Sequence, residues 1–164
     1  MSTTRGVART PEFSTRLTPA EVRTLASLAA GRTTDEARQE LGGISVNTFN
    51  DNLRRIGQKQ LKPPRASRAS KVNTAYELKD LPLPESAAPP RDIEAEDRKL
   101  WIAVATHPSI QGIARAVSLS TSAASRRIEE LMHRHGALSE PHLVRLGYAY
   151  GVLPAATETA LPAC

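Results

Sequence analysis

The order of helix signals in residues 17–80 returns in residues 91–152 at an offset of 75 residues. Ser45 corresponds to Ser120, and apolar residues follow both serines at matching positions. Between the first and second expected helices the offset becomes 76, and the extra Gly43 restores it. A repeated unit constrains the fold more than either half does alone. No segment has the alternating pattern of a strand. We therefore predict an all-α fold of two tandem four-helix units.

Capping residues and apolar spacing predict four helices in the first unit. Thr18 can cap the first helix, with Pro19 at its first position and Glu21 completing a capping box. The second helix spans 34–41, with Thr34 as its cap, the third runs from Ser45 to about residue 59, and the fourth covers about 70–78. The residues expected to face inward are Val22, Leu25, Leu28, Ala29, Ala37, Leu41, Phe49, Leu53, Ile56, Val72, Ala75 and Tyr76.

The second unit follows the same plan. Asp92 is expected to start its first helix, and Ser109 and Ser120 to cap the next two. Ser139, followed by Pro141, opens the last helix. The residues expected to face inward are Leu100, Val104, Ile110, Ile113, Val117, Ala124, Ile128, Leu131, Leu143, Leu146 and Tyr150.

Proline content separates the two units. Residues 81–90, LPLPESAAPP, contain four prolines, which a helix interior does not tolerate. We predict a Pro-rich linker here, and about 12 extended residues including it would reach roughly 35–40 Å. Residues 1–16 and 153–164 are polar or low in complexity, and we expect them to be disordered tails.

Charge is divided unevenly along the chain. The net charge is +5, but residues 1–80 carry 14 basic and 8 acidic side chains, whereas residues 81–164 carry 8 and 9. Seven of the cations lie in an acid-free run from Arg54 to Lys71. A solvated loop and a surface for an anionic partner both fit such a run.

Composition excludes several classes of protein. The one cysteine, Cys164, rules out an internal disulfide framework and a zinc finger built on paired cysteines. Aromatic residues at 4% are too few for a binder that stacks single-stranded bases on its rings. No apolar run is long enough to span a bilayer, and residues 1–15 lack the apolar core of a secretion signal. We predict no metal site and no cofactor, and we expect His133 and His135 to be surface residues and Trp101 to lie in the core or between the units.

The sequence motifs of both units indicate a family of DNA-binding domains. A short helix, a tight turn and a longer serine-capped helix follow one another, which is the order of a helix-turn-helix. The first unit reads LTPAEVRTLASLAAGRTTDEA and then ISVNTF, which resembles the LuxR/NarL-type helix-turn-helix domain over residues 17–78. The second unit resembles the same family more weakly, through PSIQGIARAVSLSTSAASRRI. The resemblance implies that the third helix of each unit reads DNA and that the fourth often serves dimerisation.

Helical geometry selects the residues that would face DNA. With the apolar stripes inward, the polar residues of helices 45–59 and 120–135 face outward, where asparagine can pair with adenine and arginine with guanine. An alternative is that Asp51 with Arg54, and Arg126 with Glu129, form ordinary ion pairs on exposed helices. The predicted DNA-binding residues are Ser45, Asn47, Thr48, Asn50, Asp51, Arg54, Arg55, Lys59, Ser120, Ser122, Ser125, Arg126 and Arg127.

These observations predict a non-enzymatic transcription regulator that binds double-stranded DNA in the major groove. RNA polymerase and a second copy of the chain are further candidate partners, and we expect a cytoplasmic, nucleoid-associated location with no membrane partner. Two alternatives stay open. The chain could use the same fold to bind a polymerase subunit or another regulator, or it could be a small sigma-factor-like protein.

Overall fold

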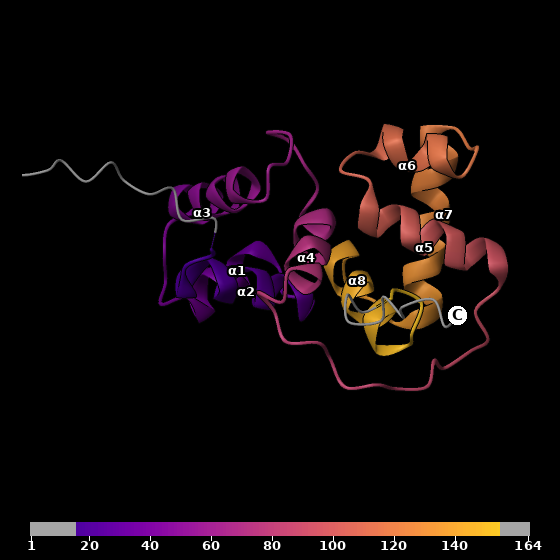
Figure 1. Ribbon diagram of the computed structural model, residues 1–164, viewed down its shortest axis with the longest axis horizontal. Helices are drawn as coiled ribbons and strands as arrows, with labels where there is room; N and C mark the ends of the chain where they lie inside the picture. Colours follow the sequence, from indigo (N-terminus) through magenta and orange to yellow (C-terminus); the bar gives the residue numbers. More distant parts are fainter. Residues whose placement is uncertain (1–15, 155–164) are drawn as a thin grey trace, which may run out of the picture.

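The computed structural model describes residues 16–154, which form eight helices and no strand (Figure 1). The predicted all-α fold is therefore confirmed for the described part of the chain. Within these residues, no helix is long and apolar enough to cross a membrane. The helices are α1 (Pro19–Ala29), α2 (Thr34–Glu40), α3 (Val46–Lys59), α4 (Arg68–Glu77), α5 (Ala95–Thr106), α6 (Ile110–Ala116), α7 (Thr121–His135) and α8 (Glu140–Ala149).

Side-chain caps start the helices of the first half. The Thr18 hydroxyl accepts a hydrogen bond from the Glu21 backbone N–H at 3.2 Å, and the Glu21 carboxylate accepts one from the Thr18 N–H at 3.0 Å. This capping box is the predicted one, and Ser45 caps α3 as predicted. The predicted cap of α2 is wrong by one residue. Thr33 has the extended backbone of a cap, whereas Thr34 is already the first helical residue.

The second half follows the predicted order of helices, with one late start. Asp92 does not start α5, because the chain stays irregular until Ala95 and Glu94 occupies the cap position without a side-chain hydrogen bond. The partly buried side chain of Ile93 packs against the core just before the helix, a contact that the sequence pattern did not predict. The other three helices start at the predicted serines, Ser109, Ser120 and Ser139.

The predicted apolar stripes of the two longest helices are buried. Phe49 and Ile56 of α3 are fully covered, and Leu53 between them is 7% exposed. Ala124, Ile128 and Leu131 of α7 are likewise buried. Burying these stripes turns the opposite faces of α3 and α7 toward solvent.

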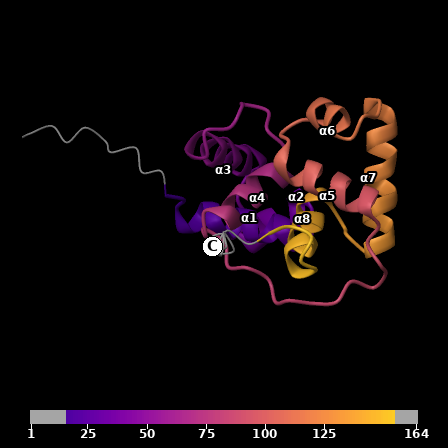
Figure 2. The same cartoon turned by 45° about the vertical axis from the view of Figure 1, so that its right-hand side comes forward.

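The two halves pack directly against each other through α4 and α8, the pair of helices with the most extensive contact. Figures 1 and 2 both show these helices side by side in the middle of the molecule. Asn73 and Tyr148 lie at equivalent positions in the 75-residue repeat, and the Tyr148 hydroxyl donates a hydrogen bond of 2.7 Å to Asn73 Oδ1. The Tyr76 and Tyr148 rings lie 4.8 Å apart, centroid to centroid. Both halves thus contribute to one hydrophobic core.

Residues 81–90 are not helical, but they do not hold the halves apart. Leu81 is buried, and the Ala87 backbone N–H donates to the carbonyl of Ala149 in α8 at 2.9 Å. The halves are much closer than the predicted reach of the linker allows, because α4 and α1 pack on α8 directly, and the linker itself stays a prediction. The division into domains 17–80 and 91–152 stays a prediction.

The predicted tails lie mostly outside the described residues. An exception is Leu153, which was expected to begin the C-terminal tail but is 4% exposed. Its backbone N–H donates to the carbonyl of Gly147 at 3.1 Å, and its side chain belongs to the core. The expected boundary of this tail is therefore wrong.

Trp101 lies at the centre of the second half, as predicted. It is fully buried, and its indole N–H donates to the Leu143 carbonyl of α8 at 2.7 Å. His135 packs on the indole with ring centroids 5.0 Å apart and is only 5% exposed. The expectation of a surface histidine is wrong for His135. The α7 helix ends at His135, so its last turn packs against Trp101 of α5.

Candidate nucleic-acid interface

The outer face of α3 carries the predicted polar residues in solvent. Since the buried stripe faces the core, Asn47, Asn50, Arg54 and Arg55 are all exposed. Asp51, on the same face, is partly covered. The structure therefore brings the amides and arginines of the predicted set together along one exposed helix surface.

The start of α3 is occupied by its own cap. Ser45 Oγ accepts a hydrogen bond from the Thr48 backbone N–H at 3.1 Å and lies 3.0 Å from Thr48 Oγ1. Both hydroxyls are exposed, but each already has a partner. Their first role is to hold the helix start in place, and contact with a phosphate would add to that role.

Arg54 is held by an ion pair within α3. Its guanidinium lies 2.9 Å from Asp51 Oδ1, with 65% and 46% of the two side chains exposed. This is the pair that the alternative interpretation of the sequence expected. A pair of this kind contributes only about 0.2–0.5 kcal/mol, so a base edge could compete for Arg54 at little cost.

Lys59 is paired with a carboxylate inside the protein. Its ammonium lies 2.8 Å from Glu21 Oε2, and the Glu21 side chain is only 3% exposed. It also donates to the Arg16 carbonyl at 3.1 Å. The prediction that Lys59 contacts DNA gains no support from this geometry, because its charge neutralises a buried carboxylate.

Much of the acid-free cationic run is built into the protein. Arg68 lies over the Phe49 ring at 5.5 Å and donates to Thr34 Oγ1 at 2.9 Å. Lys71 is only 6% exposed, and Lys62 is half-buried. Burial lowers the pKa of the Lys71 amine, and the charges of Arg68 and Lys62 lower it further. Neither interpretation of the run, as a solvated loop or as a uniform anion-binding surface, describes these residues.

Three cations of that run remain exposed: Arg54, Arg55 and Arg65. Arg65 lies in the segment that joins α3 to α4 and is absent from the predicted set of binding residues. Its place in an acid-free run next to the predicted reading helix is the signal that could have included it. These three arginines form the cationic part of the first candidate surface.

The start of α7 resembles the start of α3. Ser120 Oγ accepts from the Ala123 backbone N–H at 3.2 Å and lies 3.4 Å from Ser122 Oγ. Ser122 and Ser125 are exposed on the first turns. The predicted serines thus line the outer face of α7, with Ser120 engaged as the cap.

The two predicted arginines of α7 differ in their partners. Arg127 lies 3.3 Å from Glu96 of α5, a contact between exposed side chains. Arg126 is exposed and forms no ion pair among the described residues, so the expected pair with Glu129 is not formed. Its guanidinium is therefore more available to an outside partner than that of Arg54.

The two candidate helices point in different directions. In Figures 1 and 2, α3 lies across the picture and α7 runs down its side, with the start of α7 next to α6. The halves do not present these helices in parallel. An arrangement in which one chain reads two successive turns in the same way does not follow from this geometry.

Comparison of the chain with protein-family models, with curated proteins and with solved structures found no match. The resemblance to the LuxR/NarL-type domain therefore stays a prediction. No group of three or more metal-binding side chains occurs among residues 16–154.

Proposed function

We propose that the chain is a transcription regulator that binds double-stranded DNA by placing α3 in the major groove. The observation that carries this proposal is the exposed face of α3. Amides at Asn47 and Asn50 precede arginines at Arg54 and Arg55 on a helix whose other face is fixed in the core. Asparagine pairs with adenine edges and arginine with guanine edges, and we expect Arg55, at the flank of the helix, to contact phosphate instead.

The neighbouring helix α2 supports this placement. The segment between α2 and α3 turns through Gly42 and Gly43, both with positive φ, and Arg38 of α2 donates to the Ile44 carbonyl at 2.8 Å. Arg68 links the start of α4 to Thr34 at the start of α2. In a helix-turn-helix, the first helix holds the second one against the DNA backbone. The first contact ties α2 to the turn before α3, and Arg68, which also lies over the Phe49 ring of α3, holds α2, α3 and α4 together.

The second half has a different role in this proposal. The packing of α4 on α8 joins two halves of one chain, where the family resemblance expects a contact between two copies. In this proposal α7 therefore takes the place of the reading helix of a second copy. Arg126 on α7 is the residue that we expect to read a second, shorter element of the site. The DNA site would thus be asymmetric. Because the proposed partner is DNA, we expect the protein to have a cytoplasmic, nucleoid-associated location.

The test uses the full chain because the halves share a core. A random-library selection should enrich one DNA motif, and binding to that motif can then be measured for single variants. Arg54→Ala should change the preferred base at one position and cost about 1–3 kcal/mol, whereas Arg55→Ala should weaken all sequences alike and reduce the salt slope by about 1. Arg91→Ala, which removes the same charge before α5, is the matched control.

A second candidate function has its own supporting observation. The Asp51–Arg54 pair, the pairing of Lys59 with Glu21 and the burial of Lys71 leave fewer free cations on the first half than the sequence suggested. A helix face of mixed charge fits a protein partner, such as a polymerase subunit. Enrichment of no motif, together with binding to polymerase that depends on Arg54 and Asp51, would favour this second function.

A further inference from the structure

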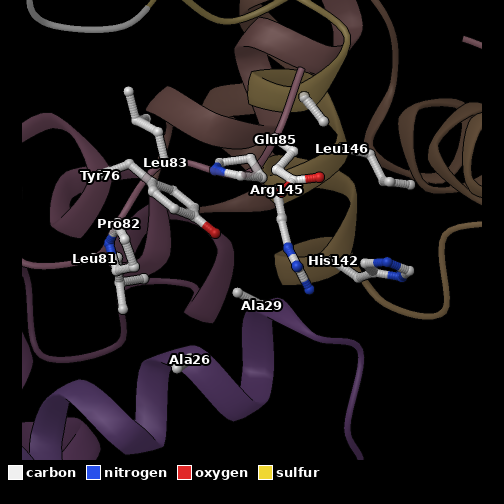
Figure 3. Close-up of a pocket in the computed structure, with 12 residues that line it drawn as sticks. Ala26, Ala29, Tyr76, Leu81, Pro82, Leu83, Glu85, His142, Arg145 and Leu146 are labelled. Atoms are coloured by element: carbon white, nitrogen blue, oxygen red, sulfur yellow. The ribbon is translucent and has the colours of Figure 1, made fainter. Parts of the chain in front are cut away.

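A cavity of about 630 Å³ lies at the seam between the two halves. Its walls come from α1, α4 and α8, and the segment 81–85 closes one side (Figure 3). Pockets of about 300–1,000 Å³ are the size that small molecules occupy in proteins. Both halves contribute to this one binding volume.

The walls of this seam cavity are largely apolar. Small side chains at Ala26 and Ala29 of α1 leave the space that Leu81, Leu83 and Leu146 surround. Leu81 is buried, whereas Leu83 is 47% exposed at the mouth. Such walls suit a ligand with an aliphatic or aromatic body.

The polar groups of the seam cavity are mostly donors. In Figure 3 the Tyr76 hydroxyl of α4 points toward the Arg145 side chain of α8, which extends past it along the same wall region. Burial raises the pKa of Tyr76, so its hydroxyl keeps its proton. His142 accepts a hydrogen bond from the Leu138 N–H on Nδ1 at 3.0 Å, which leaves Nε2 as the protonated nitrogen of the neutral ring. Glu85 is the one acid in the lining, and it is exposed.

The Arg145 and Tyr76 side chains have unused hydrogen-bonding capacity. Among residues 16–154, neither the Arg145 guanidinium nor the Tyr76 hydroxyl makes a hydrogen bond or ion pair within the protein. By contrast, Tyr148 on the other side of the seam is bonded to Asn73. A planar guanidinium binds a carboxylate through two parallel hydrogen bonds. One arginine beside one hydroxyl therefore fits a carboxylate better than a phosphate, which usually takes more cations.

We propose that the seam cavity binds a small amphipathic carboxylic acid. The apolar body lies against the alanines and leucines, and the carboxylate accepts hydrogen bonds from Arg145 and Tyr76. Because the ligand would touch α1 and α4 of one half and α8 of the other, it stabilises their packing. An effect of the ligand on DNA affinity would rest on the proposed function, whereas binding itself does not.

The test measures binding of hexanoate, decanoate, 1-decanol and octyl phosphate to the full chain by calorimetry. Decanoate should bind at least tenfold more tightly than 1-decanol. Arg145→Gln should remove this preference while leaving 1-decanol binding unchanged. Ala26→Leu, at an exposed wall position, should weaken decanoate and 1-decanol alike because it fills the cavity. Arg98→Gln, an exposed charge on α5, is the matched control, and circular dichroism checks that each variant is folded.

Two results would overturn the proposal: equal affinity for decanoate and 1-decanol, or decanoate binding that Arg145→Gln does not change. Tighter binding of octyl phosphate than of decanoate would overturn the carboxylate assignment. Failure of the carboxylates to bind at millimolar concentration would also overturn it. If the parent chain enriches no DNA motif in the random-library selection but binds decanoate, only the proposed function fails, so the two failures are distinguishable.

Discussion

Gly147 in the last turn of α8 is the position where one added methyl group should do most damage. A Cβ atom there would lie 2.6 Å from the indole Nε1 of Trp101 and 2.8 Å from Cδ1 of Leu153. The indole could not stay close enough to donate to the Leu143 carbonyl. Glycine is needed here for close approach, because Trp101 fills the space where a side chain would be.

The size of the effect follows from three contributions. Overpacking costs about 1–3 kcal/mol, and a buried indole N–H without its acceptor costs about 1–3 kcal/mol more. Alanine returns about 1 kcal/mol through its higher helix propensity. We therefore expect Gly147→Ala to lower the free energy of unfolding by about 1–5 kcal/mol. For a chain of this size that corresponds to a Tm roughly 2–20 °C lower.

Gly112 in α6 provides the matched control. A Cβ there would meet its nearest neighbours, in His107 and Ser109, at 3.4 Å, which is ordinary contact. Gly112→Ala should therefore be neutral or stabilise by up to about 1 kcal/mol through helix propensity. Denaturant unfolding followed by the fluorescence of the single tryptophan measures both variants. Equal effects of the two substitutions would refute the close-packing argument for Gly147.

Three further predictions concern the core and its charged groups. Leu53→Ala and Ile128→Ala should each cost about 2–5 kcal/mol, and each should keep a single unfolding transition because the halves share a core; two separated transitions in calorimetry would contradict this. Lys59→Met should lower the free energy of unfolding by about 3 kcal/mol, because it leaves the Glu21 carboxylate buried without its partner. DNA affinity should be unchanged at a temperature where the variant is folded. A large loss of DNA affinity without loss of stability would show that Lys59 contacts DNA. Burial lowers the pKa of His135 below its ordinary 6.5, so the unfolded chain binds a proton that the folded chain does not. The free energy of unfolding should therefore fall as the pH drops from 7.5 to 5.5. A His135→Gln variant with the same pH dependence as the parent chain would show that another group is responsible.

Local signals in the sequence predicted most of the helices. The capping box of α1 and the stripe of Phe49, Leu53 and Ile56 depend on residues within one helix, so neighbours in sequence determine them. The start of α5 was predicted wrongly because Ile93 is held by the core, which no local pattern records. A helix end that lies next to a tertiary contact can be predicted only when that contact is known.

The candidate site was harder to predict for the same reason. The exposure of Asn47 and Arg55 follows from helical spacing alone. The Lys59–Glu21 pair joins residues 38 positions apart, and the burial of Lys71 depends on how α4 packs. A run of cations in a sequence does not say which of them pair inside the protein. The seam cavity is likewise invisible to local patterns, since it arises only when α4 meets α8.

The central claim is that the exposed face of α3 reads DNA sequence. A random-library selection with the full chain, repeated with Arg54→Ala and with Arg91→Ala, tests it most directly. We predict that the parent chain and Arg91→Ala enrich the same motif, while Arg54→Ala loses its preference at one position of that motif. Enrichment of no motif by the parent chain, or an unchanged motif with Arg54→Ala, would contradict the claim.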